Sequence, residues 1–93
     1  MNEFGNLISY SRKKKRLTMT KFAQMTGLSV TYVSQIESGY CKPPARKHVL
    51  KIAEILGLEE DLTLVLSGRL PLDILPIIQR NPLVVLKIIR DLN

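Results

Sequence analysis

The residues best suited to specific recognition chemistry lie between positions 29 and 39, where apolar and polar side chains alternate at helical spacing. Val33 and Ile36 are three positions apart and would form the buried side of a helix. At about 100° per residue, the opposite side carries Val30, Thr31, Ser34 and Gln35. The Gln35 amide can form two hydrogen bonds with an adenine edge, and Val30 can contact a thymine methyl group. This side is therefore predicted to read base edges in a major groove.

Two short helices joined by a turn would position that face. Thr18 suits the N-cap of a helix that runs to about Thr26, and Gly27 can adopt the positive φ at which such a helix ends. Ser29 is the next N-cap, for a helix over residues 30–38. Two short helices around a three-residue turn that contains glycine are the signature of a helix-turn-helix motif.

Three further helices complete the predicted N-terminal unit. The periodicity of apolar residues places them at about residues 3–15, 49–56 and 59–66. The first ends in a basic run and the last begins with acidic residues, and both arrangements suit the partial charges at helix ends. Ser67 and Gly68 then mark a boundary, so that residues 1–67 form one all-α, five-helix domain.

Residues 68–93 are predicted to form an appendage of two helices. Asp73 would cap the first helix, and Asn81 with Pro82 would begin the second, which runs to about Leu92. The apolar side of this last helix covers about 200°, twice the usual stripe, and consists of Val84, Val85, Leu86, Ile88, Ile89 and Leu92. One small domain does not cover so wide a face. We therefore expect a partner, most simply a second copy of the chain.

One cysteine, Cys41, and one histidine, His48, limit the catalytic and metal chemistry that is available. A single cysteine excludes an internal disulfide, and the two residues are too few for a structural zinc site. A Cys41 and His48 nucleophile pair is the enzymatic alternative, but no third residue is evident to orient the imidazole. We expect no enzyme activity, no metal and no other cofactor.

Basic residues concentrate in the N-terminal half of the 93-residue chain, whose net charge is +6. Residues 1–51 hold ten Lys and Arg against two acidic residues, whereas residues 52–93 hold four against six. The N-terminal half is therefore expected to bind a polyanion. Proline and charged residues interrupt the aliphatic stretches, so we expect neither secretion nor membrane binding, and a cytoplasmic location.

The order of these signals resembles the phage repressor and Cro-like helix-turn-helix family, also called XRE, over about residues 4–66. The resemblance rests on Ala23, Gly27, the run 29–39 and the run 50–58. It implies a lambda-repressor-like fold in which the helix after the turn enters the major groove of double-stranded DNA.

The resemblance also implies which residues contact DNA. Base edges would be read by Ser29, Val30, Thr31, Ser34 and Gln35. Phosphates would be bound by Thr18, Lys21, Tyr32, Lys42 and Arg46. Met19 stands where many relatives carry a glutamine that anchors the backbone, so that anchor is either missing or replaced by Lys21. Relatives often form an ion pair at the positions of Arg12 and Glu37, and we expect that pair here.

These features together predict a sequence-specific transcriptional regulator, a repressor more than an activator, that binds a palindromic operator as a homodimer. The two recognition helices of such a dimer would lie about 34 Å apart. The alternative is an antitoxin, whose hydrophobic C-terminal segment masks a toxin partner while the helix-turn-helix represses the operon. Regulation would come through concentration, a protein partner or proteolysis.

Overall fold

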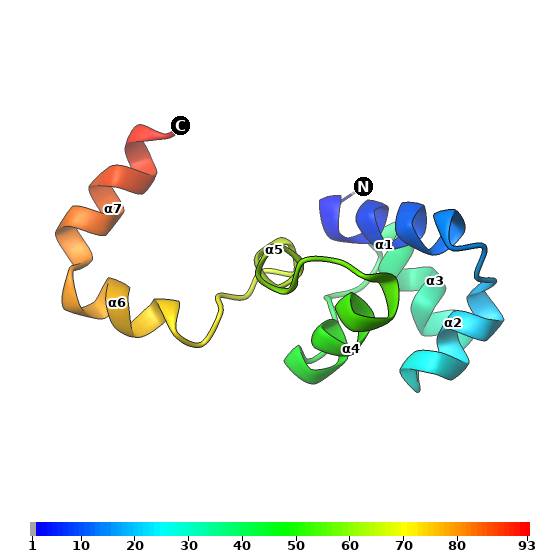
Figure 1. Cartoon of the computed structure of the whole chain (residues 1–93). Coiled ribbons are helices and arrows are strands. Elements are labelled where there is room, and N and C mark those ends of the chain that lie inside the picture. The colour runs from blue at the N-terminus through cyan, green and yellow to red at the C-terminus, as the bar shows by residue number, and fades with distance from the viewer. Residues whose placement is uncertain (1) are drawn as a thin grey trace.

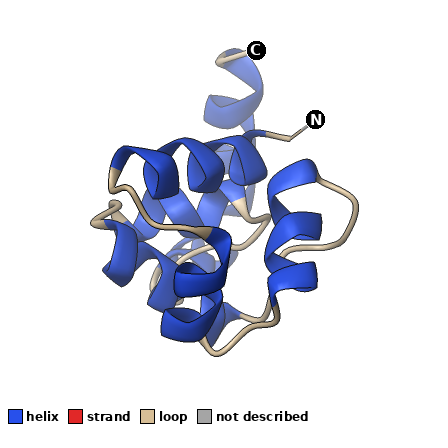
Figure 2. Cartoon of the chain, turned by 90° about the vertical axis from the view of Figure 1, so that its right-hand side faces the viewer, coloured by secondary structure: helices blue, strands red, loops and turns tan. Residues whose placement is uncertain are grey.

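The computed structural model describes residues 2–93, and these form seven α-helices and no strand (Figures 1 and 2). The helices are α1 (Glu3–Lys14), α2 (Met19–Thr26), α3 (Val30–Ser38), α4 (Arg46–Leu56), α5 (Glu60–Leu66), α6 (Ile74–Arg80) and α7 (Pro82–Asp91). The prediction of an all-α fold with five helices followed by two is confirmed. The first helix ends at Lys14 rather than Lys15, because Arg16 adopts a left-handed conformation with φ 58°.

One hydrophobic core joins α1 to α5. Its most completely buried large side chains are Phe22, Ile8, Ile52, Val33 and Val49. They come from the first four helices, and Leu64 adds a contribution from α5. Burial of one apolar stripe from each helix is the main stabilising force in a domain of this size. The core therefore also determines which side of α3 remains in solvent.

The helices around the turn begin and end at the residues that the sequence indicates. The Thr18 hydroxyl accepts a hydrogen bond from the Lys21 amide at 3.0 Å, and the Ser29 hydroxyl accepts one from the Tyr32 amide at 3.0 Å. Gly27 closes α2 with φ 77°, in the left-handed region where a Cβ atom is unfavourable. These local interactions hold the turn between α2 and α3.

The last two helices meet at a sharp bend and extend away from the five-helix body, and this pair is called the hairpin (Figure 1). α6 and α7 contact each other, and neither helix contains a buried residue. The molecule is accordingly elongated, with extents of 45 × 23 × 22 Å. The apolar side of α7 is therefore left in solvent within one chain.

The hairpin differs from the sequence prediction at its caps. Asp73 has a right-handed helical conformation and makes no side-chain cap bond to α6. Asn81 makes no cap bond to α7 either, since the nitrogen of its side-chain amide, Nδ2, donates to the Ile77 carbonyl at 3.1 Å. The helices thus begin after Asp73 and Asn81 as predicted, but neither side chain forms the capping bond. α6 and α7 are separated by Asn81 alone, and its side chain closes the first helix instead of opening the second.

Candidate nucleic-acid interface

The exposed side of α3 is the centre of the candidate interface. Val33 and Ile36 are only 1% and 4% exposed, so the core holds one side of the helix. The other side and the N-cap carry five exposed residues: Ser29, Val30, Thr31, Ser34 and Gln35. The structure therefore brings all the predicted base-reading residues onto one solvent-facing surface. Their hydroxyl, amide and methyl groups match the donors, acceptors and methyls of a major groove.

A buried ion pair holds the C-terminal half of α3 against α1. Arg12 Nε donates to Glu37 Oε2 at 2.7 Å and Nη2 donates to Oε1 at 3.0 Å, which is a two-pronged arrangement. The two side chains are 7% and 6% exposed. Arg12 Nη1 donates to the Leu17 carbonyl at 2.7 Å, so the guanidinium also binds the segment before α2. One side chain thus connects the two ends of the helix-turn-helix to α1.

The electrostatics of this pair favour the charged arginine. The hydrogen bonds donated to Glu37 raise the pKa of Arg12 above its ordinary value, while burial of the guanidinium acts in the opposite direction. A raised arginine pKa adds stability that is fully present below the ordinary pKa and is lost only as the pH rises past the raised value. Arg12 therefore keeps its charge, and its hold on α3, throughout the physiological range.

Gly5 is a positioning residue that the sequence analysis did not identify. A Cβ atom at this position would lie 2.5 Å from the Ile36 carbonyl oxygen and 2.8 Å from that of Glu37. Only glycine lets the backbone of α1 approach the end of α3 so closely. The available signal was a glycine inside a helical pattern, which lowers helix stability and usually has a packing reason.

The predicted phosphate-binding residues divide into two groups. Thr18, Lys21 and Lys42 are exposed and Tyr32 is half-buried, so each has a side chain at or near solvent. Arg46 is different, because its Nη1 donates to the Leu70 carbonyl at 2.9 Å. The chain after α5 returns across the start of α4 and binds this guanidinium. The structure thus gives Arg46 a partner within the protein, and its contact with a phosphate stays a prediction.

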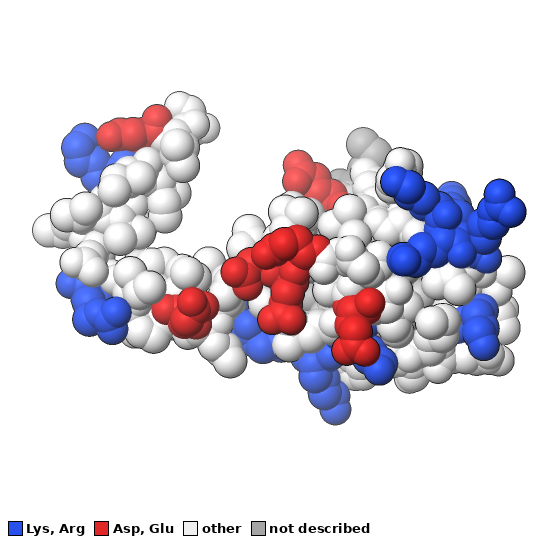
Figure 3. All heavy atoms as spheres, in the orientation of Figure 1, with Lys and Arg blue, Asp and Glu red and all other residues white. Residues whose placement is uncertain are grey.

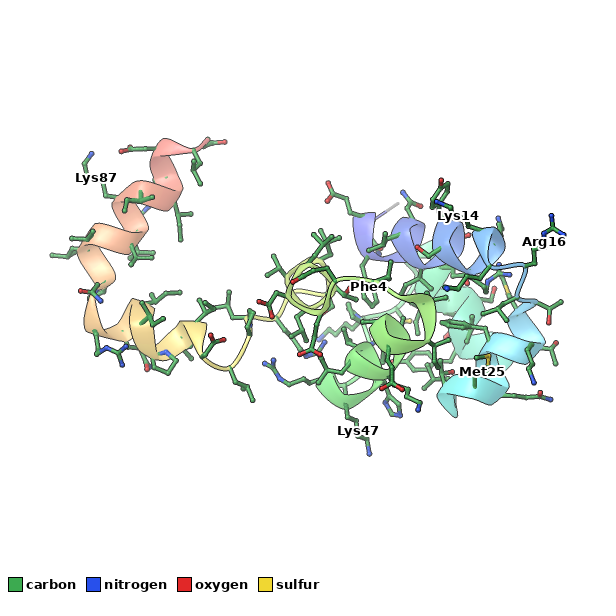
Figure 4. The ribbon with its side chains drawn as sticks, viewed as in Figure 1. Phe4, Lys14, Arg16, Met25, Lys47 and Lys87 are labelled. Carbon is green, nitrogen blue, oxygen red and sulfur yellow. The ribbon has the colours of Figure 1, made fainter. Side chains whose placement is uncertain are left out.

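Charge is distributed unevenly over the surface. Lys and Arg side chains gather at the end of α1, whereas Asp and Glu lie over the middle of the molecule, around the start of α5 (Figure 3). Figure 4 shows Lys14 and Arg16 projecting from this basic end. Lys14 Nζ lies 5.9 Å from the centre of the Tyr10 ring, where a cation–π attraction restrains it. Both groups lie on the five-helix body, the basic one at the end of α1 and the acidic one around the start of α5.

Three other features of residues 2–93 concern the cysteine, the metal-binding side chains and the lengths of the helices. Cys41 is half-buried and packs against the hydrophobic core. No group of three metal-binding side chains occurs within these residues. None of the helices described for them has both the length and the apolar character that crossing a bilayer would need.

This arrangement defines the class of the protein. The helix-turn-helix family model matches residues 8–62, which is more than half of the chain. The chain therefore belongs to the helix-turn-helix family, and its motif is of the XRE type, a class of DNA-binding transcription regulators rather than of enzymes.

Known proteins that are similar to the chain include a phage control-region protein and a regulator that was solved in complex with DNA. The chain is 39% identical over 57 residues to the ImmF control region 10 kDa protein of Bacillus phage phi105. The matched stretch covers 61% of this chain and 62% of the relative. The chain thus spans less than two thirds of that relative. The crystal structure of the master regulator for biofilm formation SinR in complex with DNA matches with a TM-score of 0.59 and 24% identity, covering 66% of this chain and 97% of that chain. This second likeness confirms the predicted lambda-repressor-like, all-α fold.

Proposed function

We propose that the chain binds double-stranded DNA sequence-specifically, with α3 in the major groove, and regulates transcription as a repressor. The observation that carries this proposal is the exposed row of five side chains, four polar and one apolar, on α3 and its N-cap, while the opposite side of the helix is held by the core and by Arg12. A rigid helix with a free, chemically varied face is what direct readout of base edges requires. The DNA complex of SinR and the control-region origin of the phage relative agree with this proposal.

The contacts divide by chemistry. Base edges are read by Ser29, Val30, Thr31, Ser34 and Gln35. Phosphates are bound by Thr18, Lys21, Tyr32 and Lys42, and the exposed basic end of α1 attracts the DNA. No cofactor or metal is needed, because occupancy of the operator is the mechanism. The protein would act in the cytoplasm, where a phage or bacterial operator lies.

The same chain forms a homodimer in this proposal. Residues 1–67 are the DNA-binding domain and residues 68–93 are the dimerisation segment. Its apolar face consists of Val84, Val85, Leu86, Ile88, Ile89 and Leu92, of which only Val85 is half-buried within one chain. A second copy would cover this face and place two α3 helices over a palindromic operator.

An antitoxin is the alternative, and the exposed apolar face of α7 also favours it. In that case a toxin, rather than a second copy, covers the face. Co-purification from the native host distinguishes the two, because an antitoxin carries a stoichiometric partner of a different mass. A repressor elutes as a homodimer without one.

Gln35→Ala tests the assignment of the base readers. Loss of the amide should reduce discrimination at one base pair of the operator by about 1 to 3 kcal/mol and leave binding to other sequences unchanged. Lys42→Ala is the matched control, because loss of a phosphate contact should weaken binding to all DNA and reduce the salt slope by about one. Competition binding with single-base operator variants at several salt concentrations measures both. Equal losses for both variants on every sequence contradict the roles.

Ile89→Asp tests the dimer. A buried charge at the centre of the apolar face should convert the dimer to monomers and greatly weaken operator binding, since half-site cooperation is lost. Sedimentation equilibrium and operator titration measure the two effects. Arg90→Asp, on the polar side of the same helix, is the control and should remain dimeric. A dimeric Ile89→Asp protein would refute this role of α7.

A further inference from the structure

The segment that joins the five-helix body to the hairpin is folded against the body. The Ser67 hydroxyl is buried and donates to the Leu64 carbonyl at 2.6 Å. The amides of Gly68 and Arg69 donate to the carbonyls of Val65 and Leu64, each at 2.9 Å, and Gly68 turns the chain with φ 88°. These bonds order the first half of the connection, up to residue 69.

The second half is held by Arg46. Its guanidinium donates to the Leu70 carbonyl, and the next residue, Pro71, is buried in a groove lined by α4 and α5. Glu60 and Asp61 line the same groove, and their carboxylates favour a cation there. A second groove beside Arg46 is lined by Leu75, Pro76 and Gln79 of the hairpin's first helix. Arg46 thus lies where the body, the connection and α6 meet.

Arg46 is also close in sequence to the candidate interface. It is the first residue of α4, and only residues 39–45 separate it from the end of α3. The segment that follows α3, the proposed recognition helix, and the segment that leads to α6 and α7 therefore meet at the Arg46 side chain. We propose that Arg46 is a positioning residue that fixes the hairpin relative to α3 and so makes the dimer select operators by the spacing of their half-sites.

The physical reason is the dependence of bivalent binding on linker stiffness. A flexible connection spreads the second recognition helix over many positions, whereas a stiff one concentrates it at one separation and orientation. With Arg46 in place, the connection from residue 67 to residue 73 is restrained at both halves. The inference rests on the proposed function, because it concerns how a DNA-binding dimer measures its operator.

The experiment compares the full-length wild type with Arg46→Met, which keeps the apolar stem and loses the donor, and with Lys47→Met. Lys47 is the matched control, because it carries the same charge one residue along α4 and projects into solvent (Figure 4). An operator is first selected from random duplexes with the wild type. Affinities are then measured for its two half-sites at spacings changed in single base-pair steps, and for one half-site alone.

The wild type and Lys47→Met should bind best at one spacing and lose roughly tenfold or more in affinity two base pairs away. Arg46→Met should lose most of this preference while its affinity for a single half-site and its salt slope stay unchanged. A uniform loss on all DNA with a salt slope smaller by about one would instead make Arg46 a phosphate ligand and overturn the proposal. If Arg46→Met shows the same dependence of affinity on half-site spacing as the wild type, the proposal is overturned as well.

A second readout separates this inference from the proposed function. Spin labels at Gln24→Cys in α2 and Lys87→Cys in α7, in a Cys41→Ser chain diluted with unlabelled protein, report the distance from body to hairpin without DNA. The distance distribution should be narrow in the wild type and broad in Arg46→Met. Equal widths overturn the positioning role. A wild type that ignores DNA yet shows this difference refutes the proposed function and leaves Arg46 as a restraint on the hairpin.

Discussion

Replacing Glu37 by alanine is expected to lower the free energy of unfolding by about 3 to 5 kcal/mol, which is a large share of the stability of a small domain. The Arg12 side chain is only 7% exposed in the wild type, and the substitution leaves its guanidinium with only the Leu17 carbonyl as a partner. Removal of one member of a buried pair is costly because the remaining charge is unpaired in a medium that solvates it poorly. Urea unfolding of the DNA-free protein, followed by circular dichroism, measures the change.

The exposed pair of Lys51 and Glu54 supplies the control for this prediction. Their charged atoms lie 3.8 Å apart and the side chains are 50% and 76% exposed, so Glu54→Ala should cost less than about 1 kcal/mol. A double variant with methionine at positions 12 and 37 should recover much of the loss, because no charge then remains buried. If Glu37→Ala and Glu54→Ala unfold at the same urea concentration, the buried pair does not hold α3.

Gly5→Ala is the second substitution with a large expected effect. Alanine is the better helix former by about 1 kcal/mol, so helix propensity alone predicts stabilisation. The added Cβ would, however, lie 2.5 Å and 2.8 Å from two backbone carbonyl oxygens at the end of α3. Backbone cannot rotate away as a side chain can, so α1 and α3 must separate, at a net cost of about 3 kcal/mol.

Thermal unfolding and operator titration measure the two consequences of Gly5→Ala. The melting temperature should fall, and specific DNA affinity should fall further than nonspecific affinity, because the recognition helix is displaced while the surface charge is unchanged. Asn6→Ala is the control, since Asn6 is exposed on the same helix and alanine there should leave stability the same or slightly higher. A Gly5→Ala protein as stable as that control would contradict the close approach.

Much of the recognition unit could be predicted because its signals are local. The hydroxyls of Thr18 and Ser29 bond amides three residues along the chain, and Gly27 stands at the turn whose backbone requires positive φ. The periodicity of Val33 and Ile36 then identifies the exposed side of α3 as well as the buried one. The same kind of reasoning located the starts of α6 and α7 at Asp73 and Asn81 but not the bonds of the two side chains, because a short connection between helices offers a side chain several competing backbone partners.

The sequence by itself therefore determined the helices, their order, the motif and the row of side chains that faces solvent, since each depends on residues within one or two helical turns. Tertiary structure alone decided what happens at Gly5 and Arg46. Gly5 matters because the backbone of α3 passes beside it, and Arg46 is bound because a segment 24 residues later crosses its side chain. Contacts of that kind depend on how whole helices pack, and no local pattern of residues encodes them.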